Sequence, residues 1–141
     1  MKIARWLGVA QLACCLLLAG CGRAPLTPVS GKVAYKGFNL QSGVIVFTPD
    51  AGRGERGSIA VAKIREDGSY TLSTGDAPGA SPGWYRITVS ALANTSFTQP
   101  AGQGFTYPTS LLPEKYRDPE SSLLTCEVKP GRTNTIDFNL D

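Results

Sequence analysis

The sequence predicts an all-β protein, an antiparallel Greek-key β-sandwich of about seven strands that follows a cleaved signal peptide. Three observations lead to this prediction. The chain contains 16 Gly and 10 Pro in 141 residues, so turns are frequent. Most apolar residues come in short runs that alternate with polar ones, as in half-buried strands. After residue 20, no stretch keeps a helical period over three turns.

The first 20 residues are typical of a secretory signal peptide. Lys2 and Arg5 make the start positive, and residues 6–18 are apolar with Gln11 as the clear exception. An apolar run of roughly 13 residues is too short to cross a bilayer core of about 30 Å as a mature helix. We therefore expect removal of this segment, leaving about 120 residues, which is one domain's worth.

The residues that close the apolar run, Leu18-Ala19-Gly20-Cys21, resemble the bacterial lipobox. This resemblance implies that Cys21 carries acyl chains and becomes the first residue after cleavage. The alternative is an ordinary secreted protein cut near Ala19 or Gly20. Residues 21–28 are predicted to form a short tether, because Pro25 and Pro28 favour extended backbone.

Four strands are predicted in the first half of the domain, residues 29–141. Residues 29–36 alternate, and residues 43–48 are apolar enough to be buried on nearly both faces. Residues 58–64 carry Ile59 and Val61, and residues 69–73 turn Tyr70 and Leu72 inward. The hairpin between the last two uses Gly68, which can adopt positive φ without strain.

Three further strands are predicted at residues 84–92, 122–129 and 133–141. The first of these turns Tyr85, Ile87 and Val89 inward, which places Trp84 on the outer face. The second places Cys126 inward. The last closes the sheet with its inward residues Ile136, Phe138 and Leu140.

Charge and cysteine content exclude several classes of protein. The net charge of +3 falls when Lys2 and Arg5 leave with the signal, and the remaining charges are scattered, so no basic patch for nucleic acid is expected. Of the four Cys, two lie in the signal and Cys21 is acylated. Cys126 therefore has no partner within its own chain, and we expect a packed thiol rather than a disulfide.

The sequence offers little chemistry. It contains no His, which removes the usual general base near neutral pH and the commonest metal ligand. We expect no catalytic residues, metal site or cofactor. The loop carboxylates that could share one end of the sandwich are predicted to be solvated turn residues: Asp50, Glu55, Glu66, Asp67 and Asp76. A second acidic group is predicted to pair with Lys115 and Arg117: Glu114, Asp118 and Glu120.

Trp84 and the irregular crossing at residues 94–115 are the candidate binding elements. Such a long loop is uncommon unless it has a function. It carries Phe97, Phe105 and Tyr107, which either bind a ligand or cap the core. Trp84 likewise either offers an exposed ring for stacking or is covered by the loop.

Several segments together resemble a group of bacterial lipoproteins that are abundant in planctomycetes. The motifs are Val29-Ser30-Gly31-Lys32-Val33, Val46-Phe47-Thr48-Pro49, Glu66-Asp67-Gly68-Ser69-Tyr70, Pro82-Gly83 and Leu112-Pro113-Glu114-Lys115-Tyr116. The resemblance implies a transthyretin-like, carboxypeptidase-regulatory-like sandwich, similar in kind to immunoglobulin-type folds. It implies architecture and little chemistry.

The expected function is a lipid-anchored, non-catalytic module of the cell envelope. It would be held by the acyl chains of Cys21 and would bind an envelope protein or polysaccharide. Gly22 is not the aspartate that retains enterobacterial lipoproteins at the inner membrane, which favours the outer membrane. The alternatives are a carbohydrate-binding module that uses Trp84 and residues 94–115, or a small carboxylate- or metal-dependent hydrolase.

Overall fold

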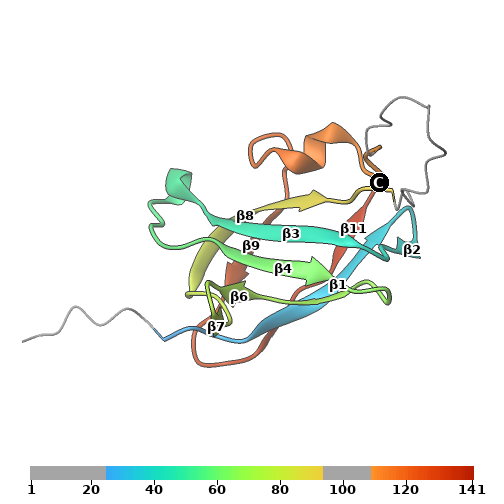
Figure 1. Ribbon diagram of the computed structural model, residues 1–141. Helices are drawn as coiled ribbons and strands as arrows, with labels where there is room; N and C mark the ends of the chain where they lie inside the picture. Colours follow the sequence, from blue (N-terminus) through green and yellow to red (C-terminus); the bar gives the residue numbers. More distant parts are fainter. Residues whose placement is uncertain (1–24, 94–108) are drawn as a thin grey trace, which may run out of the picture.

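Two β-sheets pack face to face in the computed structural model, which describes residues 25–93 and 109–141 (Figure 1). The only helical segments in these ranges are two short 3-10 turns, η1 (Ala51–Arg53) and η2 (Glu114–Arg117). The strands in chain order are β1 (Val29–Tyr35), β2 (Phe38–Asn39), β3 (Gly43–Pro49), β4 (Ala60–Ile64), β5 (Ser69–Thr71), β6 (Ser73–Thr74), β7 (Ala77–Pro78), β8 (Gly83–Ser90), β9 (Thr125–Val128), β10 (Asn134–Thr135) and β11 (Phe138–Leu140). Each of the seven predicted strands has a counterpart among them.

The larger sheet has the order β7-β6-β4-β3-β8-β9, and all of its pairings are antiparallel. Its centre is the pair β3–β8, with Phe47 opposite Ile87 and Ile45 opposite Val89. These four side chains point inward and are fully buried. The apolar run of residues 43–48 thus forms a central strand, as a continuous apolar segment predicts.

The smaller sheet is organised around β1, which pairs antiparallel with β2 and β5 and parallel with β10 and β11. The prediction of a wholly antiparallel sandwich is therefore wrong in this sheet. The reason is that β9 ends near the start of β8, and the turn at residues 129–133 returns the chain to the point where Val29 begins β1. The last strand consequently runs in the same direction as the first.

A local interruption divides the last strand into β10 and β11. The carbonyl of Ile136 accepts a hydrogen bond of 2.6 Å from the Tyr70 hydroxyl, and the side chain of Asp137 accepts one of 2.7 Å from the backbone N–H of Lys32. A Cβ atom at Gly31 would overlap the Ile136 carbonyl oxygen. Glycine at position 31 thus allows the close approach that lets Tyr70 reach across to the last strand.

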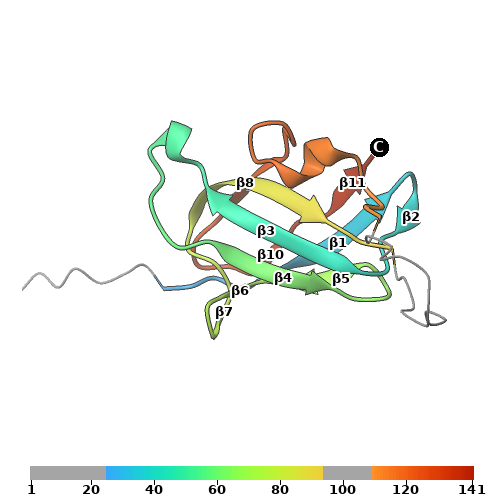
Figure 2. The ribbon, with the colours of Figure 1, turned by 45° about the horizontal axis from the view of Figure 1, so that its top comes forward.

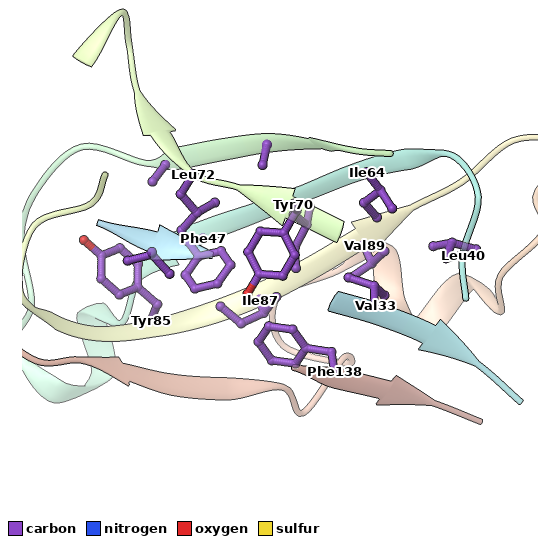
Figure 3. Close-up of a cluster of buried hydrophobic side chains, with 14 of the residues drawn as sticks. Val33, Leu40, Phe47, Ile64, Tyr70, Leu72, Tyr85, Ile87, Val89 and Phe138 are labelled. Carbon is purple, nitrogen blue, oxygen red and sulfur yellow. The ribbon is translucent and has the colours of Figure 1, made fainter. Parts of the chain in front are cut away.

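The core lies between the sheets, and Phe47 is at its centre (Figure 3). Its ring centroid lies 6.1 Å from that of Tyr70, 5.8 Å from Tyr85 and 6.0 Å from Phe138. These separations and the tilted or edge-on angles are favourable for aromatic pairs. Because Tyr70 and Phe138 come from the smaller sheet, the aromatic cluster joins the two layers.

The inward faces of most strands are those that alternation predicts, but β4 differs. The structure buries Ala60, Ala62 and Ile64, whereas Ile59 is 52% exposed and Val61 lies on the outer face. The alanines pair with Phe47 and Ile45, so small side chains lie beside large ones within the same layer. Ile59 and Val61 share their face with Lys63, which the opposite arrangement would have buried.

The strand register defines two ends of the sandwich, visible in Figures 1 and 2. At the entry end, the chain pairs Thr27 with Ala80, and the β3–β4 loop, the β6–β7 turn and residues 129–133 lie beside it. At the far end lie the β1–β2 and β4–β5 turns and the C-terminal residue Asp141. Leu40 is buried next to the β1–β2 turn.

Candidate functional site

Trp84 lies on the outer face of the larger sheet near the entry end, where alternation along β8 predicts it. Its neighbour Tyr85 is buried in the core, and the Tyr85 hydroxyl donates a 2.8 Å hydrogen bond to the carbonyl of Ser81. The indole itself is half-buried. Other parts of the described chain must therefore cover some of it.

The cover comes from the loop between β3 and β4. The guanidinium carbon of Arg53, in η1, lies 3.9 Å from the centre of the Trp84 ring, which is a close cation–π contact. Sequence reasoning did not identify Arg53. The position of the loop follows from the register of β3 and β8, in which Pro49 lies opposite Tyr85. The chain therefore leaves β3 beside Trp84, and η1 begins there.

Asp50 holds Arg53 in place. This carboxylate is 4% exposed; it accepts hydrogen bonds from Arg86 Nε at 2.9 Å and from the backbone N–H of Gly52 at 3.1 Å. Arg53 Nε lies 3.3 Å from its other oxygen. Burial raises the pKa of Asp50, but the hydrogen bond and charge of Arg86, with Gly52 and Arg53, outweigh burial and lower the pKa overall.

Arg86 and Glu55 complete this cluster, which we call the Trp84 cluster: Asp50, Arg53, Glu55, Trp84, Arg86 and Glu120. Arg86 pairs with Glu120 as well as Asp50, and these hydrogen bonds raise its pKa. Glu55 accepts the backbone N–H of Trp84 at 3.2 Å, which ties the loop to the start of β8. Charges alternate in sign across the cluster, and each carboxylate accepts a hydrogen bond from an arginine or from a backbone N–H.

This arrangement determines what the cluster can do. A free indole face could stack on a sugar, but here the Arg53 guanidinium occupies one face. The carboxylates are committed to arginines or to backbone N–H groups, so they are poorly placed to serve as acid and base. The cluster is built to fix the β3–β4 loop against the outer face of the sheet.

The five loop carboxylates that were predicted to be solvated turn residues do not share one end of the sandwich, and for Asp50 the prediction is wrong, because that side chain is buried. Asp50, Glu55 and Asp76 lie at the entry end, whereas Glu66 and Asp67 lie in the β4–β5 turn at the far end. Asp67 accepts from the Ser69 hydroxyl at 2.6 Å and from its N–H at 3.0 Å, and these bonds lower its pKa. Within residues 25–93 and 109–141, no three His, Cys, Asp or Glu side chains are placed to hold a metal ion.

The acidic residues around η2 pair with partners other than those predicted. Glu120 pairs with Arg86, and Lys115 Nζ lies 3.8 Å from Asp141. Asp118 accepts the backbone N–H of Glu120 at 2.6 Å, so it caps a turn. The predicted partners are close in sequence, whereas the observed ion pairs depend on how η2 packs against the sheet.

Tyr116, in η2, is 2% exposed and its hydroxyl reaches the end of the chain. It donates toward Asp141 Oδ1 at 2.8 Å and accepts from the Asp141 backbone N–H at 3.0 Å. The hydrogen bond lowers the pKa of the Asp141 carboxyl. As in a tyrosine corner, a tyrosine hydroxyl here holds backbone in place. The contact differs because it joins two segments that are distant in sequence rather than neighbouring backbone.

Cys126 packs against the core as a free, half-buried thiol on β9. Burial raises its pKa to about 12. Thiolate is the nucleophilic form, so this side chain is unreactive near neutral pH. Four other predicted residues, Cys21, Phe97, Phe105 and Tyr107, lie outside the described residues.

Among residues 25–93 and 109–141, the structure contains no helix of the length and hydropathy that a membrane crossing needs. Comparison of the chain with protein-family models, curated proteins and solved structures found no match.

Proposed function

We propose that this chain is a lipid-anchored, non-catalytic binding or assembly module of the bacterial cell envelope, with its domain outside the cytoplasm. The observation that carries the proposal is the motif Leu18-Ala19-Gly20-Cys21 at the end of a signal-like apolar run. The domain begins soon after it, because Thr27 is already buried and paired with Ala80. A short tether then joins an acylated Cys21 to the domain.

We further propose that the sandwich is of the Greek-key, transthyretin-like type of the lipoproteins that the sequence resembles. The path of the chain supports this. After β4 it leaves the larger sheet to add β5 to the smaller one, and it returns with β6, β7 and β8. Strands that neighbour one another in the larger sheet, such as β3 and β8, are thus far apart in sequence, as Greek-key connections require.

A non-catalytic role is supported by the chemistry of the described side chains. The chain has no His, and its most buried carboxylate, Asp50, is held by two arginines. The free thiol of Cys126 has a raised pKa. These groups favour a rigid binding or assembly domain over an enzyme.

The carbohydrate-binding alternative makes a separate demand on the Trp84 cluster. A sugar that stacks on the Trp84 face now occupied by Arg53 would have to displace that guanidinium. Arg53→Ala should then increase affinity for a peptidoglycan or polysaccharide fragment, and Trp84→Ala should remove it. If Arg53→Ala leaves affinity unchanged while Trp84→Ala abolishes it, the sugar uses the other face of the ring.

The anchor is tested by mass spectrometry of the mature N-terminus. We expect a diacylglyceryl group on Cys21, and accumulation of uncleaved chain when the lipoprotein signal peptidase is inhibited. Cys21→Ala should release the domain from the membrane fraction. A mature Cys21 with a free thiol and a free amine would overturn the proposal. Crosslinking of the anchored protein in cells then identifies its partner.

A further inference from the structure

We propose that the entry end of the sandwich lies against the lipid headgroups of the membrane that holds Cys21, so that the far end points away from it. The surface in question consists of the β3–β4 loop, the β6–β7 turn and residues 129–133. This inference rests on the proposed function. It goes further because it assigns a face of the domain to the headgroups and leaves the opposite face for partners.

The first argument is the length of the tether. The Thr27 N–H donates to the Ala80 carbonyl at 2.8 Å and the Ala80 N–H donates back at 3.0 Å, so the chain is fixed at Thr27. From Cys21 to Thr27, six extended residues span at most about 20 Å. From Thr27 to the end of β1 near Lys36, nine residues of strand cover roughly 30 Å. The tether is therefore too short for the far end to face the membrane.

The second argument is charge. Exposed basic side chains at the entry end outnumber exposed acidic ones, since Asp50 and Glu55 are engaged within the Trp84 cluster. Outside the Trp84 cluster, the exposed charges at the entry end are Arg56, Lys129, Arg132 and Asp76, with Glu127 nearby on β9. The far end carries both signs in balance: Lys36, Lys63, Arg65 and Lys115 beside Glu66, Asp67, Glu114 and Asp141.

An excess of cations near a surface of anionic lipid favours this orientation. The excess is small, so the acyl chains supply the attachment and the charges set the angle. The entry end also carries Trp84, and an indole with one apolar and one polar side suits the interface between water and lipid.

Trp84 provides a direct test. The sequence has two Trp, and the other, Trp6, leaves with the signal, so the tryptophan fluorescence of the mature protein comes from Trp84 alone. Mature lipidated protein is placed in vesicles of phosphatidylethanolamine and phosphatidylglycerol, with a nitroxide on some of the headgroups. We expect most of the Trp84 fluorescence to be quenched. A nitroxide deep in the acyl chains should quench little.

A matched control moves the single Trp to the other end. Phe38, in the β1–β2 turn, is 79% exposed, and the double variant Trp84→Phe, Phe38→Trp should show almost no quenching in the same vesicles. Glu66→Trp with Trp84→Phe tests the far end independently if the first variant folds poorly. Quenching at both ends means that the domain lies on its side and overturns the inference.

The charge argument has its own comparison. The variant Lys129→Gln, Arg132→Gln should lose part of the Trp84 quenching, whereas Lys63→Gln, Arg65→Gln at the far end should not. Protein that lacks acyl chains by mass spectrometry and does not float with vesicles overturns the proposed function. Lipidated protein that floats but keeps its Trp84 fluorescence overturns the orientation alone.

Discussion

Gly31 is a residue whose identity is dictated by a contact across the sheet, because the close approach there leaves no room for a side chain. The motif Val29-Ser30-Gly31-Lys32-Val33 shows that a glycine interrupts a strand, but it does not show why. The structure gives the reason, because Ile136 turns its carbonyl over Gly31 to accept the Tyr70 hydroxyl. The backbone N–H of Lys32 donates to the side chain of Asp137, 105 residues away in sequence, and this hydrogen bond fills the gap in the ladder.

We therefore expect Gly31→Ala to destabilise the protein strongly, because the new methyl group overlaps backbone that cannot move without breaking the sheet. Tyr70→Phe should cost less, about 1–3 kcal/mol, since it leaves one buried carbonyl without a donor. Denaturant titrations measure both. Gly37→Ala is the control, because a Cβ there meets open space and only the positive φ is strained. Equal losses for Gly31→Ala and Gly37→Ala would contradict the close approach.

Cys126 gives a prediction with a definite dependence on pH. Its pKa rises from 9.0 to about 12 in the folded protein, so the unfolded chain loses this proton first. Stability from this group is complete below pH 9.0 and is lost as pH rises toward about 12. Tyr70, whose pKa burial also raises, adds to the same loss.

We expect slow reaction of Cys126 with thiol reagents in the native protein and fast reaction after denaturation. Cys126→Ala should cost about 1 kcal/mol at neutral pH, since little volume is removed. It should also flatten the loss of stability above pH 9.0, measured by denaturant titration. Rapid labelling of native protein would show that the thiol is not held against the core.

At the scale of elements, alternation predicted inward faces well wherever a strand had one apolar face. For residues 58–64 the prediction named Ile59 and Val61, yet Ala60, Ala62 and Ile64 are the buried set. The charge of Lys63 is the signal that was missed. Lys63 shares a face with Ile59 and Val61, so turning that face inward would bury it. The Trp84 cluster was missed for another reason: the contact of Arg53 with Trp84 depends on the register between β3 and β8, which no local pattern encodes.

The Trp84 cluster should respond to acid. Its carboxylate Asp50 has a lowered pKa, so the stability it contributes is present above its unfolded pKa of 3.8 and is lost as pH falls below that value. Protonation weakens the hold on Arg53, and the Trp84 emission should shift to longer wavelength. In Asp50→Asn this acid transition should be absent, whereas Glu55→Gln should keep it. A transition that survives in Asp50→Asn would assign it to another group.

The short helix η2 depends on one hydroxyl. Tyr116→Phe keeps the buried ring but removes its hydrogen bonds with Asp141, so we expect a loss of about 1 kcal/mol. Tyr116→Ala should cost roughly 3 kcal/mol or more, because the ring packs in the core. Denaturant titrations of the two variants separate hydroxyl from ring. If both variants are as stable as the parent protein, Tyr116 does not stabilise the fold.

At the scale of the whole molecule, the all-β class and the seven strand segments could be predicted because turns and alternation are local signals. The parallel pairing of β1 with β10 and β11 could not, since it depends on where the chain returns after β9. The candidate site divides in the same way. The outward position of Trp84 follows from period two, whereas the Trp84 cluster is assembled from three segments: the β3–β4 loop, β8 and Glu120.

The boundary between tether and domain is a property of the whole chain, and truncation tests it. A chain that starts at Pro25 keeps the pairing of Thr27 with Ala80 and should match the mature protein in denaturant titrations. A chain that starts at Val29 loses both hydrogen bonds of that pairing and the Pro28 carbonyl that accepts from the Asn134 N–H. We expect it to be less stable by about 1–3 kcal/mol, because Ala80 and Asn134 keep backbone groups without protein partners. Thr27 is 4% exposed, so removing it also opens the core edge at the entry end. If the two truncated chains were equally stable, Thr27 and Pro28 would belong to the tether, which would lengthen its reach by about 6 Å and loosen the orientation proposed for the domain.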